Sequence, residues 1–131
     1  MEKNNQNQNA EFDFKTIDDF AKVCEKCGTT EEKFNQKWPK EKFDKDTIAY
    51  EALKLVFRAI NNERKPDYNN SDEIRYFSLH WVRSSGSAFV FSYCSYTSSH
   101  TILGSRLATF SPEQVYHINK YFDYLWVDFK L

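Results

Sequence analysis

Glycine and proline are scarce in this chain, with three of each among 131 residues. A Gly-x-Ser-x-Gly nucleophile elbow and a glycine-rich phosphate loop each need several glycines close together, and the sequence contains neither motif. It also lacks an apolar run of the roughly 18 residues that a membrane-spanning helix requires. These absences exclude the commonest hydrolase and nucleotide-binding motifs, and they predict that the protein does not enter a membrane.

Cysteine is also rare, and neither sign of charge is in excess. The three cysteines form an odd set and no apolar leader opens the chain, so we expect the reducing cytoplasm rather than a disulfide framework. The formal net charge is -1, from 18 Lys and Arg against 19 Asp and Glu. Because proteins that live on nucleic acid usually carry a basic excess, this balance argues against a general nucleic-acid binder.

Aromatic side chains are abundant: 12 Phe, 8 Tyr and 3 Trp make up 18% of the chain. Such large side chains supply much buried area per residue, and a chain of this length is expected to form one domain with its own core. Residues 1–12 include an Asn- and Gln-rich stretch without apolar periodicity, which predicts a disordered polar tail. We therefore expect a single domain over residues 13–131.

Two short amphipathic helices are predicted near the N-terminus. The first covers residues 17–27, with Thr16 as its capping residue and Gly28 as its stop. The second follows Thr29 and ends at Pro39.

The clearest helical pattern covers residues 46–63, where Asp46 is the expected N-cap and the apolar residues repeat on one face. A last helix is predicted to follow Ser111, with Pro112 in its first turn. Its apolar stripe continues to Phe129.

Between these two helices, three stretches alternate with the period of a β-strand: residues 74–83, 88–97 and 101–110. Gly86 suits a hairpin turn between the first two. We predict an α+β fold with N-terminal helices, a three-stranded antiparallel meander and a C-terminal helix packed on the sheet. The apolar phases also predict one cluster of residues buried together: Phe57, Phe77, Phe91, Leu107 and Phe122.

Cys24 and Cys27 have the spacing of half a zinc site. A structural zinc site needs four ligands, and no second Cys-x-x-Cys or closely spaced His pair follows. Two small apolar residues on a helix face need no metal to explain them. We therefore expect no metal and no other cofactor.

The polar phase of the predicted sheet gives the candidate binding residues, which are Tyr76, His80, Tyr96 and Arg106. Tyrosine and arginine are enriched among interface hot spots, and Gly104 within a strand usually marks a bulge or the close approach of another backbone. The same residues would also suit base stacking by single-stranded nucleic acid. Arg106 has a structural alternative, which is stacking on Tyr96 or pairing with a carboxylate of the same fold.

The chain resembles a family of small uncharacterised proteins encoded by phages and mobile elements of gut bacteria. The likeness covers about residues 47 to 129 and is carried by five segments: Ala52–Val56, Lys65–Glu73, Ser84–Gly86, Gly104–Leu107 and Tyr121–Asp123. The chain departs from the family at residues 78–80, where a more aromatic run is usual, and at Ala108, where Cys is frequent. The resemblance implies no known activity, but it implies a phage or mobile-element setting.

From these features we expect a non-enzymatic accessory protein that acts as a protein-binding or assembly module. It would reside in the host cytoplasm and bind a host or phage protein or counteract a host defence. Alternatively, it would be a minor component of the virion. A homo-oligomer is an open alternative for the partner. The alternative functions are a single-stranded nucleic-acid-binding protein that uses the aromatic sheet face and, third, a small enzyme with a cryptic site.

The first prediction concerns zinc. Because the Cys24 and Cys27 pair lacks further ligands in the sequence, purified protein should contain far less than one zinc per chain. Elemental analysis of protein prepared without chelators measures this directly, and stoichiometric zinc would contradict it.

Overall fold

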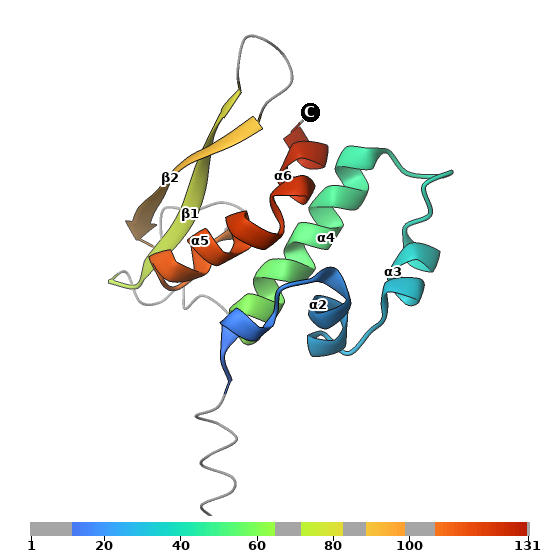
Figure 1. Ribbon diagram of the computed structural model, residues 1–131, viewed down its shortest axis with the longest axis horizontal. Helices are drawn as coiled ribbons and strands as arrows, with labels where there is room; N and C mark the ends of the chain where they lie inside the picture. The colour runs from blue at the N-terminus through green and yellow to red at the C-terminus, as the bar shows by residue number, and fades with distance from the viewer. Residues whose placement is uncertain (1–11, 65–71, 83–88, 99–106, 131) are drawn as a thin grey trace, which may run out of the picture.

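The computed structural model describes residues 12–64, 72–82, 89–98 and 107–130. Within these ranges the order is η1 (Phe14–Thr16), α2 (Phe20–Lys26), α3 (Glu31–Lys37), α4 (Lys45–Ile60), β1 (Ile74–Val82), β2 (Phe89–Ser98), α5 (Pro112–Tyr121) and α6 (Asp123–Lys130). The fold is α+β, because a layer of helices lies beside a two-stranded antiparallel sheet (Figure 1). The predicted tail, residues 1–12, lies outside the described residues except for Phe12, which packs against the core.

The N-terminal helices begin at side-chain caps. Asp19 accepts a hydrogen bond from the backbone N–H of Lys22 at 2.8 Å, so α2 starts later than predicted. Thr30 caps α3 in the same way, one residue after the predicted position. Gly28 takes a positive φ of 77° after α2, which is the stop that the sequence indicated.

The long helix α4 forms the centre of the helical layer. It begins after Asp44 rather than at Asp46, and it ends at Ile60, before the predicted limit at residue 63. The chain leaves the helix because Asn62 and Glu63 take positive φ values of 54° and 61°, a region that ends a helix. Its inward face is apolar and fully buried along its length, as the pattern predicted.

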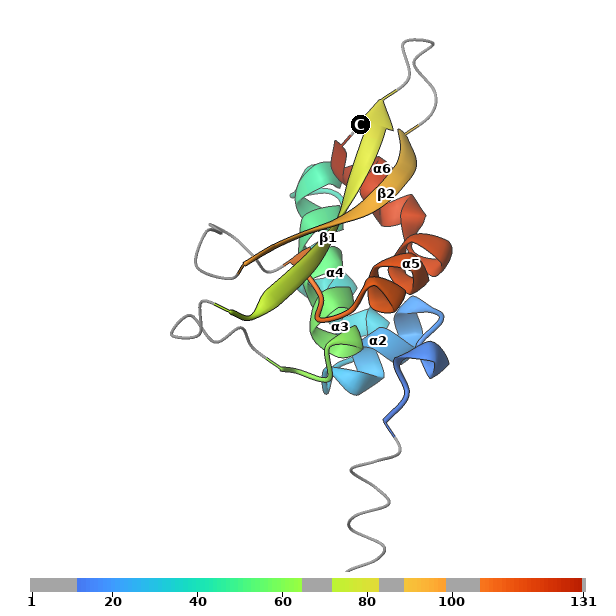
Figure 2. The same cartoon turned by 90° about the vertical axis from the view of Figure 1, so that its left-hand side faces the viewer.

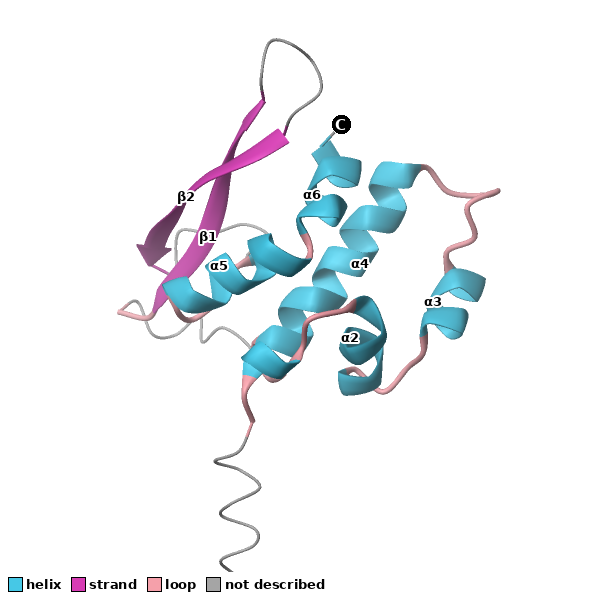
Figure 3. Cartoon of the chain, viewed as in Figure 1, coloured by secondary structure: helices cyan, strands magenta, loops and turns pink. Residues whose placement is uncertain are grey.

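The two strands pair antiparallel, with Ile74 opposite Ser98 and Val82 opposite Phe89. The register shifts between Leu79 and His80, so the simple alternation predicted along the second strand is interrupted there. The hairpin lies on the side of α5 and α6, away from α2 and α3 (Figure 3), and in the turned view it passes over the helical layer (Figure 2).

Within the described residues the structure supports two antiparallel strands and not the predicted three-stranded meander. Residues 99–106 of the predicted third strand lie outside the described residues, and Leu107 to Phe110 form only one isolated bridge, between Thr109 and Tyr76. This bridge is on β1, whereas a meander would have placed the third strand beside β2. The local alternation of the sequence could not predict which strand this segment meets, because that depends on how the chain is held after α4.

The predicted single C-terminal helix is divided at Phe122. Its backbone φ of -130° lies outside the helical range, so α5 ends and α6 starts one residue later. Both helices contact the sheet, and α6 packs along α4. The division keeps Phe122 fully buried while it redirects the chain. Ser111 caps α5 through a capping box with Gln114, as the sequence suggested for the start of this helix.

The hydrophobic core is built mainly from α2, α4, α5 and α6. Of the predicted cluster, Phe57 and Phe122 are buried as predicted, whereas Leu107 is only partly buried against the same core. Phe77 is only half-buried and does not belong to this core cluster. The side chain of Phe91 lies outside the described residues. Among the helices of the described ranges, none combines the length and apolar character needed to cross a bilayer.

The second prediction concerns this core. Replacing Phe122, which is 0% exposed, with Ala should lower the free energy of unfolding by about 3–5 kcal/mol, because the cavity left behind cannot fully collapse. Urea denaturation followed by circular dichroism measures the loss. Phe43→Ala is the matched control, since Phe43 is 37% exposed and should cost much less. Equal losses in both variants would show that Phe122 is not central to the core.

Candidate functional site

Two tyrosines face one another across the hairpin. Tyr76 of β1 is opposite Tyr96 of β2 in the register, and their ring centroids are 6.4 Å apart with the planes tilted by 50°. Tyr96 is 68% exposed, the largest exposure among the exposed large hydrophobic residues of the described ranges, whereas Tyr76 is half-buried. This arrangement presents an aromatic surface with phenolic hydroxyl groups to the solvent.

The backbone beneath this pair is firmly held. Tyr76 and Thr109 exchange both backbone hydrogen bonds, at 3.0 and 2.7 Å. The adjacent Arg75 is only 1% exposed, donates to the Ala108 carbonyl at 3.4 Å and lies over the Phe110 ring at 4.7 Å. The strand that carries Tyr76 is therefore fixed on the side opposite β2.

The side chains of the other two predicted site residues, His80 and Arg106, lie outside the described residues, so the structure does not place them beside the two tyrosines. The backbone of His80 lies in β1 opposite Phe91, but its side chain is outside the described residues. Arg106 is outside them entirely. The structure thus places Tyr76 and Tyr96 together, and the roles of His80 and Arg106 stay predictions.

Sequence reasoning missed Arg75. Arg75 was in neither the predicted core nor the candidate site, yet it is among the largest fully buried side chains. The signal was present, because Arg75 shares its strand phase with Phe77, which was predicted to be buried. A buried guanidinium needs hydrogen-bond acceptors, and the Ala108 carbonyl supplies one of them.

Ser78 and Cys94 form the next pair on the same face of the hairpin as the two tyrosines. The pKa of the Cys94 thiol is raised by burial and, to a lesser extent, by the negative charge of Glu113 on α5. A thiol with a raised pKa is protonated at neutral pH and is a weak nucleophile. This pair therefore offers packing beside the tyrosines rather than covalent chemistry.

Cys24 and Cys27 are free thiols on and just after α2. Burial, followed by the charges of Glu31 and Cys27, raises the pKa of Cys24 to about 11. The pKa of Cys27 is also raised by burial, and its thiol donates to the Leu55 carbonyl at 3.5 Å. Across the described ranges no three His, Cys, Asp or Glu side chains gather as a metal site would need.

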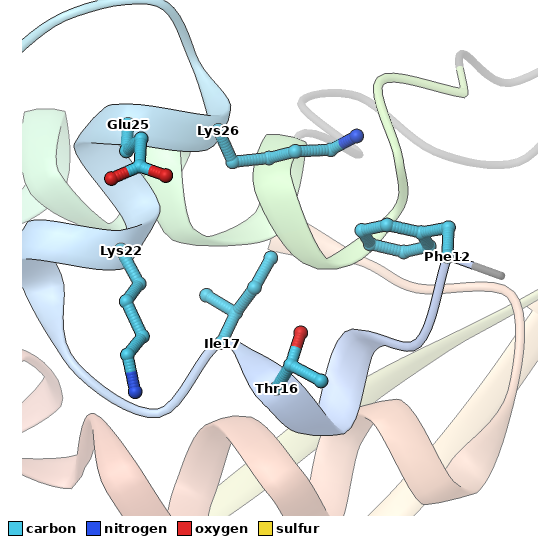
Figure 4. A pocket seen from close by; sticks show the side chains of 6 residues that line it. All are labelled: Phe12, Thr16, Ile17, Lys22, Glu25 and Lys26. Carbon is cyan, nitrogen blue, oxygen red and sulfur yellow. The ribbon is translucent and has the colours of Figure 1, made fainter. Parts of the chain in front are cut away.

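A surface hollow of about 510 Å³ lies between the segment before α2 and α2 itself (Figure 4). Its two lysines already have partners: Lys22 pairs with Asp18 at 2.7 Å, and Lys26 contacts Asn62 and the ring of Phe12, which also lines the hollow. Glu25 lies between them on the same helix. Opposite charges on one exposed rim do not converge on a reacting atom, so the hollow supplies no acid, base and nucleophile set.

His117 of α5 has a structural contact rather than a chemical role. Its Nε2–H donates to the Ile17 carbonyl at 2.7 Å. Its ring lies between those of Phe14 and Tyr121, with centroid distances of 5.3 and 4.8 Å. These contacts hold the segment before α2 against α5.

Comparison of the chain with family models, with curated proteins and with solved structures gives no match.

The third prediction concerns the thiols. Because Cys24 is 0% exposed with a pKa near 11, its thiolate is rare at pH 8 and iodoacetamide should modify it far more slowly than it modifies Cys24 in unfolded protein. Mass spectrometry of the digested protein, with and without urea, measures the difference. Equal rates in the two conditions would show that α2 does not bury this side chain.

Proposed function

We propose that this protein is a non-enzymatic protein-binding or assembly module that contacts its partner through the hairpin face bearing Tyr76 and Tyr96. The observation that carries the proposal is a 68% exposed tyrosine set against a second tyrosine on a firmly held strand. Exposed aromatic residues on a rigid support are typical of interface hot spots, because little conformational entropy is lost on binding.

The described titratable groups favour binding over catalysis. The three cysteines have raised pKa values, and the 510 Å³ hollow is lined by side chains of opposite charge that are exposed or already have partners. Catalytic sites usually show the reverse, a concave pocket in which perturbed groups converge.

The setting that we propose is a phage or mobile element, with the protein in the host cytoplasm or associated with the virion. The resemblance in the long helix, the turn that follows it and the closing helix supports this setting. In such a setting an accessory protein acts on a host protein, on an anti-phage defence or on the assembling particle, and each of these functions requires a protein surface like the hairpin face.

The fourth prediction concerns Tyr96. Tyr96→Ala should weaken partner binding by about 1 kcal/mol or more, since it removes an exposed aromatic contact, and it should leave the melting temperature nearly unchanged. The measurement is affinity capture from host lysate treated with nuclease, followed by titration of the captured protein. Tyr124→Ala is the matched control, because Tyr124 is 49% exposed but lies on α6.

Three outcomes contradict the proposal. Capture that survives Tyr96→Ala would show that the hairpin face is not the binding surface. A loss of equal size in Tyr124→Ala would show that the effect is not specific to the hairpin. Capture that disappears with nuclease treatment would instead identify the protein as a nucleic-acid binder.

A further inference from the structure

The outer edge of β2 carries backbone groups that point away from β1. Because Tyr76 exchanges both backbone hydrogen bonds with Thr109, its pair with Tyr96 is of the non-hydrogen-bonded kind. Hydrogen-bonded and non-hydrogen-bonded pairs alternate along an antiparallel ladder. Ser95 and Thr97 therefore bond to β1, and the residues that direct their N–H and C=O groups to the outer edge are Cys94, Tyr96 and Ser98.

This edge lacks the usual protection against pairing. In the part of the chain that the structure describes, no strand pairs with the outer side of β2. Edge strands are commonly protected by charged side chains, by proline, by a bulge or by a helix or loop that covers the edge. The ten residues of β2 include no charged residue and no proline, and the register shift lies beyond the 94–98 segment. That segment is therefore regular and uncharged, and within the described residues β2 is contacted by the helices α5 and α6 but its outer edge is paired with no strand.

We propose that this edge pairs with the same edge of a second copy of the chain, forming a four-stranded antiparallel sheet across a two-fold axis. When the axis passes beside Tyr96, each Tyr96 exchanges its N–H and C=O with Tyr96 of the other copy. Cys94 then lies opposite Ser98 of the other copy, and both have outward-facing backbone groups. The pattern is self-complementary, as a two-fold interface requires.

The lack of charged residues in β2 favours a second copy of the chain as the partner at this edge. In a two-fold pairing each residue meets its own kind or a close neighbour, so any charged residue near the axis would face a like charge. The neutral sequence from Phe89 to Ser98 avoids this repulsion. A two-stranded sheet is also at the lower limit of stability, and two added strands extend its ladder.

The dimer changes the candidate binding surface. Residues opposite one another in an antiparallel pair lie on the same face of the sheet, so Tyr76 and Tyr96 of both copies form one row of four tyrosines across four strands. The inference goes beyond the proposed function, because the dimer forms whether or not a partner binds.

The fifth prediction tests the edge with a proline. Cys94→Pro removes an outward N–H without removing a hydrogen bond to β1, and Cys94→Ala is the control that keeps this N–H. Sedimentation equilibrium should show a dimer for the wild type and for Cys94→Ala, with dimerisation of Cys94→Pro weakened by about tenfold or more. Circular dichroism checks that each variant is folded.

Amide hydrogen exchange of the wild-type protein gives a second measurement that does not depend on a variant. The amides of Ser95 and Thr97 should be protected at every concentration, because they bond to β1. The amides of Cys94, Tyr96 and Ser98 should gain protection only at concentrations where the dimer forms.

Several results would overturn the inference. A wild type that is monomeric at every concentration excludes the dimer, and Tyr96-dependent capture of a partner would then leave the proposed function standing. A dimer that is unaffected by Cys94→Pro places the interface elsewhere. Unchanged oligomeric state together with weaker partner capture in Cys94→Pro would assign the edge to a strand of another protein.

Discussion

The carbonyl oxygen of Ala108 accepts hydrogen bonds from two side chains: that of Asn61, just after α4, at 2.9 Å, and that of Arg75, near the start of β1, at 3.4 Å. Both side chains are buried, so each would be costly without a partner. Gln114 extends this contact, because its amide donates to the Ile60 carbonyl and its oxygen accepts from the backbone N–H of Phe110 and Ser111. The end of α4, the start of β1 and the start of α5 are thereby held together.

This contact also explains why the two edges of the hairpin differ. With Ala108 held by Asn61 and Arg75, the next residue, Thr109, is placed beside Tyr76 and exchanges both hydrogen bonds with it. The outer edge of β1 is thus covered at this point. Among the described residues no strand pairs with the outer edge of β2, which also carries the more exposed tyrosine. One buried polar contact therefore positions the strand that supports the candidate surface.

Local sequence patterns predicted the helices and strands better than they predicted which of these elements contact one another. The α4 helix, the hairpin and the capped start of α5 follow from apolar periodicity, alternation and the Ser-Pro signal, each of which depends on neighbouring residues. The division at Phe122 and the bridge from Thr109 to β1 depend on contacts with distant residues, so no local pattern indicated them. The site was predicted in part for the same reason: alternation put Tyr76 and Tyr96 on one face, while the burial of Arg75 arises from the polar contact with Ala108.

The helices and the hairpin contribute differently to the described hydrophobic core. The described hydrophobic core is formed by residues of the helices and their connections, and none of the strand side chains that the structure describes, residues 74–78 and 94–96, belongs to it. The interior contribution of these strand residues is the polar contact of Arg75, which positions the hairpin. Tyr96 stabilises little of the fold at 68% exposure, so its large aromatic ring is available for contact outside the chain. The exposed tyrosines Tyr116 and Tyr124 lie on the helices, whereas Tyr96 lies on a strand that the Arg75 contact positions, and this support is what distinguishes the hairpin as a candidate surface.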